Sequence, residues 1–110
     1  MLFDELGVRY KALDSLPDDV LRELRDGVVG VLTVADATHG GGLLLTLEAY
    51  LAGGYSVSET AAALFIHRNT LRKRLARIEA LTDLDLASSG GQAEAYLSVH
   101  AAEVLAIREG

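Results

Sequence analysis

The chain has 110 residues, half of them apolar, which suits one small globular domain with a hydrophobic core and excludes two independent catalytic lobes. It contains no cysteine, so disulfides and thiolate metal sites are excluded, as in a protein of the reducing cytoplasm. No apolar run approaches the roughly 20 residues of a membrane span, and the formal net charge of −6, taken alone, argues against a nucleic-acid partner.

Residues 1–42 are expected to form lead-in helices. A short helix is predicted near Gly7 to Leu13. Ser15 before Pro17, followed by two aspartates, is typical of a helix start, because a side-chain oxygen can accept free N–H groups and carboxylates suit the positive helix end.

The stretch from Val28 to Val34 is ambiguous. Its β-branched residues suit a buried strand, but no second strand is available to pair with it, so we predict a helix. Asp36 to Gly42 ends in three glycines and is expected to interrupt the helices. It lacks the Lys-Ser/Thr pair of a phosphate-binding loop, which leaves a linker as the better interpretation.

A helix is predicted from Leu43 to the glycine pair Gly53-Gly54, which suits a left-handed C-cap. One face of this helix carries Leu44, Leu47, Tyr50 and Leu51. Ser56 or Ser58 is expected to cap the next helix, which runs to about Leu64 or Phe65.

A longer helix is predicted from Arg68 to about Thr82. Its apolar residues Leu71, Leu75 and Ile78 follow spacings of four and three and form one stripe. The preceding short helix offers small residues, Ala61 and Ala62, where a second helix can cross. Two short helices over a shared apolar contact are typical of a helix-turn-helix.

The remaining residues are expected to form a loop from Asp83 to Gly91 and a final helix over about Gln92 to Ile107. The predicted buried face of that helix comprises Ala93, Tyr96, Leu97, His100, Ala101, Val104 and Leu105.

Charge along the chain is strongly uneven. Residues 67–82 hold five Arg/Lys and one acid, a local charge of +4, whereas the other 94 residues carry −10. An acidic body with one basic helix favours oriented binding of a polyanion, and in this helix the basic residues lie away from the apolar stripe, as entry into the major groove of DNA requires.

Position along the helix suggests roles for its polar residues. The start of a recognition helix reaches deepest, so Arg68, Asn69 and Thr70 are candidates for reading bases, since Arg pairs with guanine, Asn with adenine, and Thr can touch a thymine methyl. Lys73, one turn after Asn69, can read a base or bind the backbone. Phosphate contacts are expected from Arg72, Arg74, Arg77 and Ser56, with a helix cap as the alternative role for the serine.

These residues also carry a family resemblance. The string His67–Leu71, followed by Arg74–Glu79 and by Leu81–Leu86, resembles the C-terminal helix-turn-helix domain of PucR/CdaR-type bacterial transcriptional regulators over about residues 43–86. The core of the motif is also similar to the helix-turn-helix of Fis-type DNA-bending proteins.

The resemblance implies a regulator that binds promoter DNA as a homodimer and has a sensory domain upstream, which these 110 residues do not contain. In the Fis-type motif the start of the recognition helix makes the contacts, which carries over to His67, Arg68, Asn69, Thr70 and Lys73. One departure is Phe65, which stands where such turns usually place glycine. Because positive φ is costly for a bulky side chain, we expect another turn geometry with Phe65 packed inward.

No motif indicates an enzyme, a cofactor or a metal. The histidines His39, His67 and His100 are scattered, and the His100–Glu103 spacing has no second such pair to complete a metal site. No serine lies in the context of a catalytic nucleophile.

The sequence therefore predicts an all-α protein of about five to six helices. Residues 1–42 are lead-in helices with a possible dimer contact, residues 43–86 the DNA-binding core, and residues 87–110 an amphipathic helix that also offers an apolar face for dimerisation. The predicted function is sequence-specific binding of double-stranded DNA through a recognition helix at about 68–82. Two alternatives remain open, namely a nucleoid-type architectural DNA-binding protein and a protein-interaction module of helix-turn-helix shape.

Overall fold

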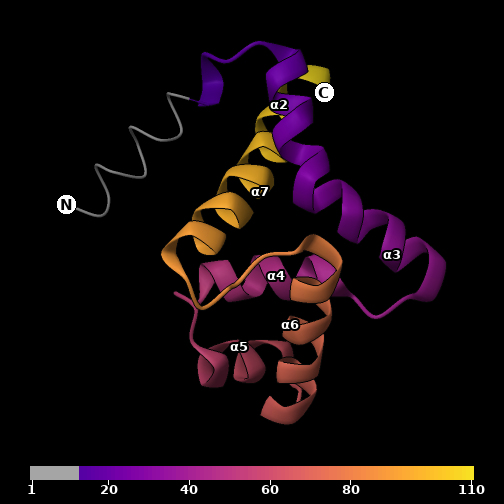
Figure 1. The fold of residues 1–110 in the computed structure, drawn as a ribbon, viewed down its shortest axis with the longest axis vertical. Coiled ribbons are helices and arrows are strands. Elements are labelled where there is room, and N and C mark those ends of the chain that lie inside the picture. The colour runs from indigo at the N-terminus through magenta and orange to yellow at the C-terminus, as the bar shows by residue number, and fades with distance from the viewer. Residues whose placement is uncertain (1–12) are drawn as a thin grey trace.

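The computed structural model describes residues 13–110, and every regular element in that range is helical, which confirms the all-α prediction. The predicted helix near Gly7 to Leu13 lies almost wholly outside the described residues. The elements are α2 (Asp18–Arg25), η1 (Asp26–Gly30), α3 (Val31–His39), α4 (Leu43–Ala52), α5 (Val57–Leu64), α6 (Arg68–Thr82) and α7 (Ser89–Glu109) (Figure 1).

The start of α2 is fixed from the other end of the chain. Its N-cap residue is Pro17, which makes no side-chain cap, and two aspartates lie in its first turn as expected. Arg108 near the end of α7 donates to the Leu16 carbonyl at 2.9 Å, to Asp18 Oδ1 at 2.6 Å and to the Asp14 carbonyl. This guanidinium ties the last turn of α7 to the first turn of α2.

The Val28–Val34 stretch is helical, as predicted, but the sequence did not reveal that the helix widens there into the π-turn η1. Ser98 on α7 is the cause. Its hydroxyl accepts from the Val29 N–H at 3.0 Å and donates to the Arg25 carbonyl at 2.9 Å. In an uninterrupted α-helix these two backbone groups would bond to each other, so the side chain of α7 is inserted into the hydrogen-bond ladder.

The final helix α7 begins earlier than expected and presents a different face. Ser88 caps it by accepting from the Gly91 N–H at 3.0 Å, so Ser89, Gly90 and Gly91 are its first turn and not a loop. Of the predicted face, Ala101, Val104 and Leu105 are buried, but Ala93 is exposed and Tyr96, Leu97 and His100 are half-buried. The buried face is rotated toward the small residues Gly91, Ala95 and Ser98, which are buried where Ala93, Tyr96 and Leu97 were expected.

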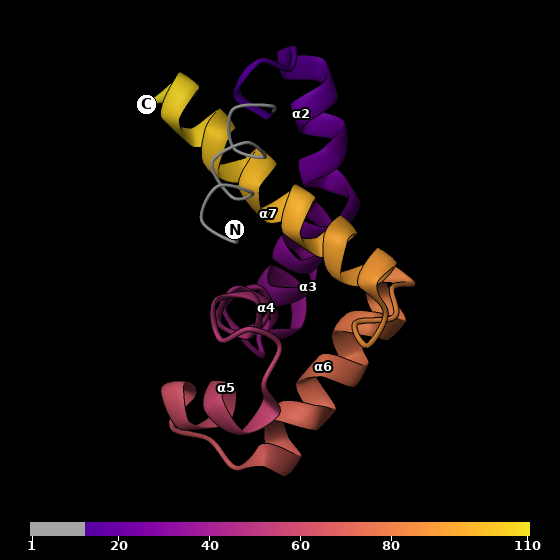
Figure 2. The same ribbon diagram turned by 90° about the vertical axis from the view of Figure 1, so that its left-hand side faces the viewer.

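Two hydrophobic clusters divide the molecule. The smaller one joins Leu13 and Leu21 to Ala101, Val104 and Leu105, where α2 crosses α7. The larger one gathers buried residues of η1, α3, α4, α5, α6 and the first half of α7. In both ribbon views α2 and α7 cross at one end of the molecule, whereas α5 and the start of α6 form the other end (Figures 1 and 2).

Two adjacent glycines in the first turn of α7 are expected to respond oppositely to alanine. A Cβ on Gly91 would lie 2.0 Å from the Asp85 carbonyl oxygen, which is backbone and cannot rotate away, whereas a Cβ on Gly90 would meet nothing within 4 Å. Gly91→Ala is therefore expected to lower the free energy of unfolding by about 1–3 kcal/mol, and Gly90→Ala to raise it by up to about 1 kcal/mol. Urea denaturation of both variants checks this, and equal effects at the two sites would contradict the close packing of α7 on Asp85.

Candidate nucleic-acid interface

Asp36 in α3 determines where α4 begins. The predicted break at Asp36 to Gly42 is confined to Gly40–Gly42, because α3 continues to His39. The N-cap residue of α4, Gly42, has no side chain to offer, and the Asp36 carboxylate takes that role by accepting from the N–H groups of Leu43 at 2.8 Å and Leu44 at 3.1 Å. A carboxylate beside a helix N-terminus also opposes the helix dipole favourably.

The first helix of the motif is α5, and Ser56 caps it. The Ser56 hydroxyl accepts from the Glu59 N–H at 3.2 Å. Of the two small residues expected at the helix crossing, Ala61 is buried, but Ala62 is exposed. One alanine is enough for contact with α6, because the neighbouring residues Leu64 and Ile66 fill the space beside it in the larger cluster.

The turn between α5 and α6 keeps the positive φ that a glycine would favour, even though Phe65 occupies it. Phe65 has φ 56° and ψ 42° and its side chain is 95% exposed, so the expectation that it packs inward in another geometry is wrong. The Ile66 N–H donates to the Ala61 carbonyl at 3.0 Å and the Phe65 N–H to the Ala62 carbonyl at 3.2 Å. These two bonds form a Schellman C-cap, which requires the left-handed residue at this position.

The second helix of the motif, α6, begins at Arg68 and ends at Thr82, as predicted. Its N-cap is His67, whose Nδ1 accepts from the Asn69 N–H at 3.0 Å. Because Nδ1 accepts this hydrogen bond, the other ring nitrogen, Nε2, is the one that can bond to a group outside the helix. His67 is therefore a structural cap of α6 as well as an exposed side chain at its start.

The apolar stripe of α6 is buried as predicted. Leu71 and Ile78 are fully covered and Leu75 is 8% exposed. The side chains away from the stripe are exposed, namely Arg68, Asn69, Thr70, Arg72, Lys73, Ala76 and Arg77. Arg74 differs from the other cations because it is half-buried and donates to Thr46 Oγ1 on α4 over a long 3.4 Å.

One flank of α6 forms a basic pocket with the glycine turn. This pocket of about 260 Å³ is lined by His39, Gly40, Gly41, Leu43, Thr70, Lys73, Arg74 and Arg77. The end of α3 thus lies beside the middle of α6, although the two segments are far apart in the sequence. No local sequence pattern relates His39 or the glycines to α6.

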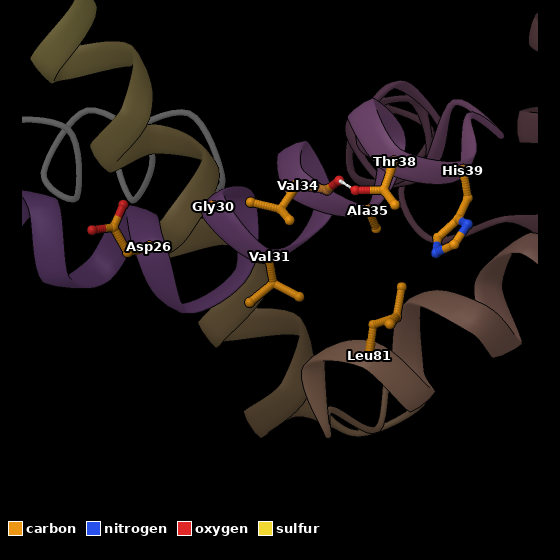
Figure 3. A pocket seen from close by; sticks show the side chains of 8 residues that line it. All are labelled: Asp26, Gly30, Val31, Val34, Ala35, Thr38, His39 and Leu81. Atoms are coloured by element: carbon orange, nitrogen blue, oxygen red, sulfur yellow. Dashed lines mark hydrogen bonds between the residues drawn. The ribbon is translucent and has the colours of Figure 1, made fainter.

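A second hollow lies between α3 and the end of α6 and is mainly apolar. It has a volume of about 620 Å³, and its walls include Val31, Val34, Ala35 and Leu81. Figure 3 shows Leu81 of α6 facing the side chains of α3 across this groove. Val34 is 67% exposed and Leu81 is 40% exposed, so the groove leaves apolar surface uncovered in the single chain.

The C-terminal end of α6 is held by its own acidic residues. Asp83 ends the helix in a left-handed conformation, and Glu79 accepts from the Leu86 N–H at 2.8 Å, which turns the chain back toward the core.

Burial, and secondarily the Glu79 carboxylate, raise the pKa of Tyr50 in the larger cluster. The phenol of Tyr50 therefore stays neutral, with its ring edge-on to Tyr55 at 5.5 Å between centroids.

Within residues 13–110, no group of three or more His, Asp or Glu side chains is placed to hold a metal ion. His100 Nδ1 lies 3.0 Å from the Glu103 carboxylate, and its ring is tilted by 41° against that of Tyr96, with 4.0 Å between the ring centroids. Among the described helices, none is both long enough and apolar enough to cross a membrane.

A short helix joined by a tight turn to a longer one, the second with its apolar stripe buried and its basic side outward, defines a helix-turn-helix domain. The family model of the PucR C-terminal helix-turn-helix domain matches residues 43–101, more than half of the chain, and the chain belongs to this family, which confirms the resemblance. It is a domain of transcriptional regulators of the PucR type.

Two characterised relatives match parts of the chain. The proline-responsive transcriptional activator PutR of Bacillus subtilis (strain 168) is 31% identical over 98 residues, which is 88% of this chain and 24% of the relative. The transcriptional activator PmfR of Paenarthrobacter nicotinovorans is 48% identical over 56 residues, which is 51% of this chain and 12% of the relative. The matched region thus spans a quarter or less of each relative. No solved structure matches the fold.

The capping role of His67 can be separated from any role in binding. His67→Ala is expected to lower the free energy of unfolding by about 1 kcal/mol, because α6 loses its N-cap acceptor. His67→Ser is expected to retain the wild-type value, because serine can accept the same Asn69 N–H. Thermal and urea unfolding of the two variants measure this difference, and an alanine variant as stable as the serine variant would show that the imidazole does not cap α6.

Proposed function

We propose that α6 is a recognition helix that enters the major groove of double-stranded DNA and gives this regulator domain its sequence specificity. One observation carries the proposal: burial of Leu71, Leu75 and Ile78 turns the opposite, basic side of α6 to solvent at one end of the molecule. The acidic remainder of the chain repels DNA elsewhere, which leaves this face as the favoured approach.

Base reading is proposed for His67, Arg68, Asn69, Thr70 and Lys73, all of which are exposed at the start of α6. Phosphate binding is proposed for Arg72, Arg74, Arg77 and Ser56. Arg74 and Arg77 line the basic pocket together with His39, so we propose this pocket as the binding site for one phosphate of the DNA backbone. The Ser56 hydroxyl already caps α5, and it can still donate its proton to a phosphate oxygen.

We further propose that the chain binds DNA as a homodimer, with residues 43–86 as the DNA-binding core. Two recognition helices about 34–36 Å apart would read a pseudo-palindrome. In the C-terminal segment, residues 87–110, the apolar face of α7 is largely buried against α2, whereas the groove beside α3 remains open. This difference favours the lead-in helices of residues 1–42, through Val34, as the dimer contact.

The greater length of both relatives supports the further proposal that this domain acts together with a sensory domain of a longer cytoplasmic regulator. Such a sensory domain would control where and when the recognition helices engage DNA. We assign the chain no enzymatic role and no cofactor.

Charge reversal tests the DNA interface. Arg68→Glu and Lys73→Glu are each expected to weaken binding to a duplex selected from a random pool by about tenfold or more, because each removes a base or backbone contact and adds repulsion. Arg22→Glu is the matched control, since it makes the same charge change on an exposed α2 residue at the far end of the molecule. Fluorescence anisotropy at several salt concentrations provides the affinities.

The same titration separates the alternatives. Specific regulation is expected to give a preference of about 10³-fold or more for the selected duplex over random DNA. A steep salt dependence without that preference would indicate an architectural protein. Unchanged DNA association in the Arg68 and Lys73 variants would contradict a DNA interface on α6 and favour a protein-interaction module.

A glutamate in the apolar groove tests the dimer. Val34→Glu is expected to convert the protein to a monomer, because it would place an unpaired charge in the buried contact. Ile107→Glu, on the 70%-exposed side chain near the end of α7, is the control and is expected to leave the dimer intact. Sedimentation equilibrium gives the mass of each variant. If Ile107→Glu dissociates the dimer and Val34→Glu does not, the dimer contact lies on α7 and not in the groove.

A further inference from the structure

Phe65 is held in an unfavourable conformation by bonds that do not involve its side chain. The Schellman cap of α5 uses only the backbone groups of Ala61, Ala62, Phe65 and Ile66. Any residue at position 65 must therefore adopt the left-handed conformation, and glycine would adopt it without the steric conflict between a Cβ and the backbone. The aromatic side chain adds nothing to this turn.

The folded chain also leaves the ring of Phe65 without cover. The side chain is 95% exposed, more than any other large apolar side chain among residues 13–110. An aromatic ring in water gives up the stabilisation that burial would supply. A strained and exposed aromatic residue is better explained by a contact outside the chain than by folding.

The position of Phe65 indicates what that contact is. Its turn leads directly into His67, Arg68, Asn69 and Thr70, and all four are exposed. A protein-docking site would be expected to surround the ring with other large apolar side chains, but exposed Val34 and Leu81 lie together in a separate groove. Leu64 and Ile66, which flank Phe65, pack against the larger cluster, so the nearest fully exposed side chains that follow it in the chain are the polar residues from His67 to Thr70.

We propose that Phe65 is a specificity-determining residue that contacts the C5 methyl group of a thymine at the edge of the major groove. The inference rests on the proposed entry of α6 into that groove. Thymine alone presents a methyl group there, and phenylalanine is one of the side chains that read it by apolar contact. Insertion of the ring between base pairs is disfavoured, because apolar wedges of that kind act from the minor groove.

The test combines a change in the protein with the removal of one methyl group from the DNA. Phe65→Gly is expected to fold with a melting temperature at or above that of the wild type, because it removes the strain, yet to bind the selected duplex about tenfold more weakly. Phe65→Tyr keeps the ring and is expected to retain affinity. Ile107→Ala removes another exposed apolar side chain far from α6 and is expected to change nothing.

Each thymine of the selected duplex is then replaced in turn by deoxyuridine, which lacks only the methyl group. Wild-type protein is expected to lose about fourfold in affinity at one thymine, the effect of one buried methyl group. The Phe65→Gly variant is expected to be insensitive to that replacement.

The outcomes distinguish this inference from the proposed function. If wild-type protein shows no preference for the selected duplex, the proposed function itself fails. If wild type prefers that duplex and Phe65→Gly binds equally well, only the role of Phe65 is overturned. If Phe65→Gly loses affinity equally for selected and random DNA, and no deoxyuridine replacement affects the wild type, the ring contacts the sugar-phosphate backbone. If Phe65→Gly no longer dimerises but each monomer binds DNA with unchanged affinity, the ring belongs to a protein contact. Either result would refute the thymine contact.

Discussion

The burial of one apolar stripe on α6 is the constraint on which the functional surface depends. Leu71, Leu75 and Ile78 pack into the cluster built from α3, α4, α5 and α7, which fixes the rotation of α6 about its axis. A rotation by half a turn would place arginines in the core, where an unpaired charge is far more costly than a lost methyl contact. The basic side of α6 is therefore exposed as a direct consequence of how the core is filled.

Local caps then determine where this surface begins. Asp36 starts α4, Ser56 starts α5, and His67 starts α6, in each case by accepting the otherwise unpaired N–H groups of a first turn. The Schellman cap at Phe65 fixes the path between the two helices of the motif and directs the aromatic side chain outward. Stability and recognition are thus joined at the same few residues. His67 serves as a cap within a proposed reading surface, and Phe65 departs from the glycine that folding alone would favour.

The rest of the molecule gives this motif a rigid support. Ser98 replaces the bond between the Val29 N–H and the Arg25 carbonyl with two bonds to its own hydroxyl, so α7 is locked to the helix formed by α2, η1 and α3. The larger hydrophobic cluster continues from that junction to α4 and α6. The packing of α7 against η1 is therefore continuous with α6 through buried side chains.

The sequence by itself determined the helical class, the bounds of α6 and its buried stripe, because these depend on residue spacing within one helix and on charges that must stay in water. It also identified the basic residues of the proposed DNA surface, although no local signal related His39 to the pocket beside Lys73 and Arg77. Only the tertiary structure decided the rotation of α7, the π-turn and the outward direction of Phe65. Each of these depends on a partner outside the local pattern: Ser98 meets a backbone 69 residues away, Gly91 must fit against Asp85, and the cap of α5 overrides the conformational preference of a phenylalanine. Periodicity describes which side of a helix is apolar, but the fit between elements selects which residues of that side make the contact.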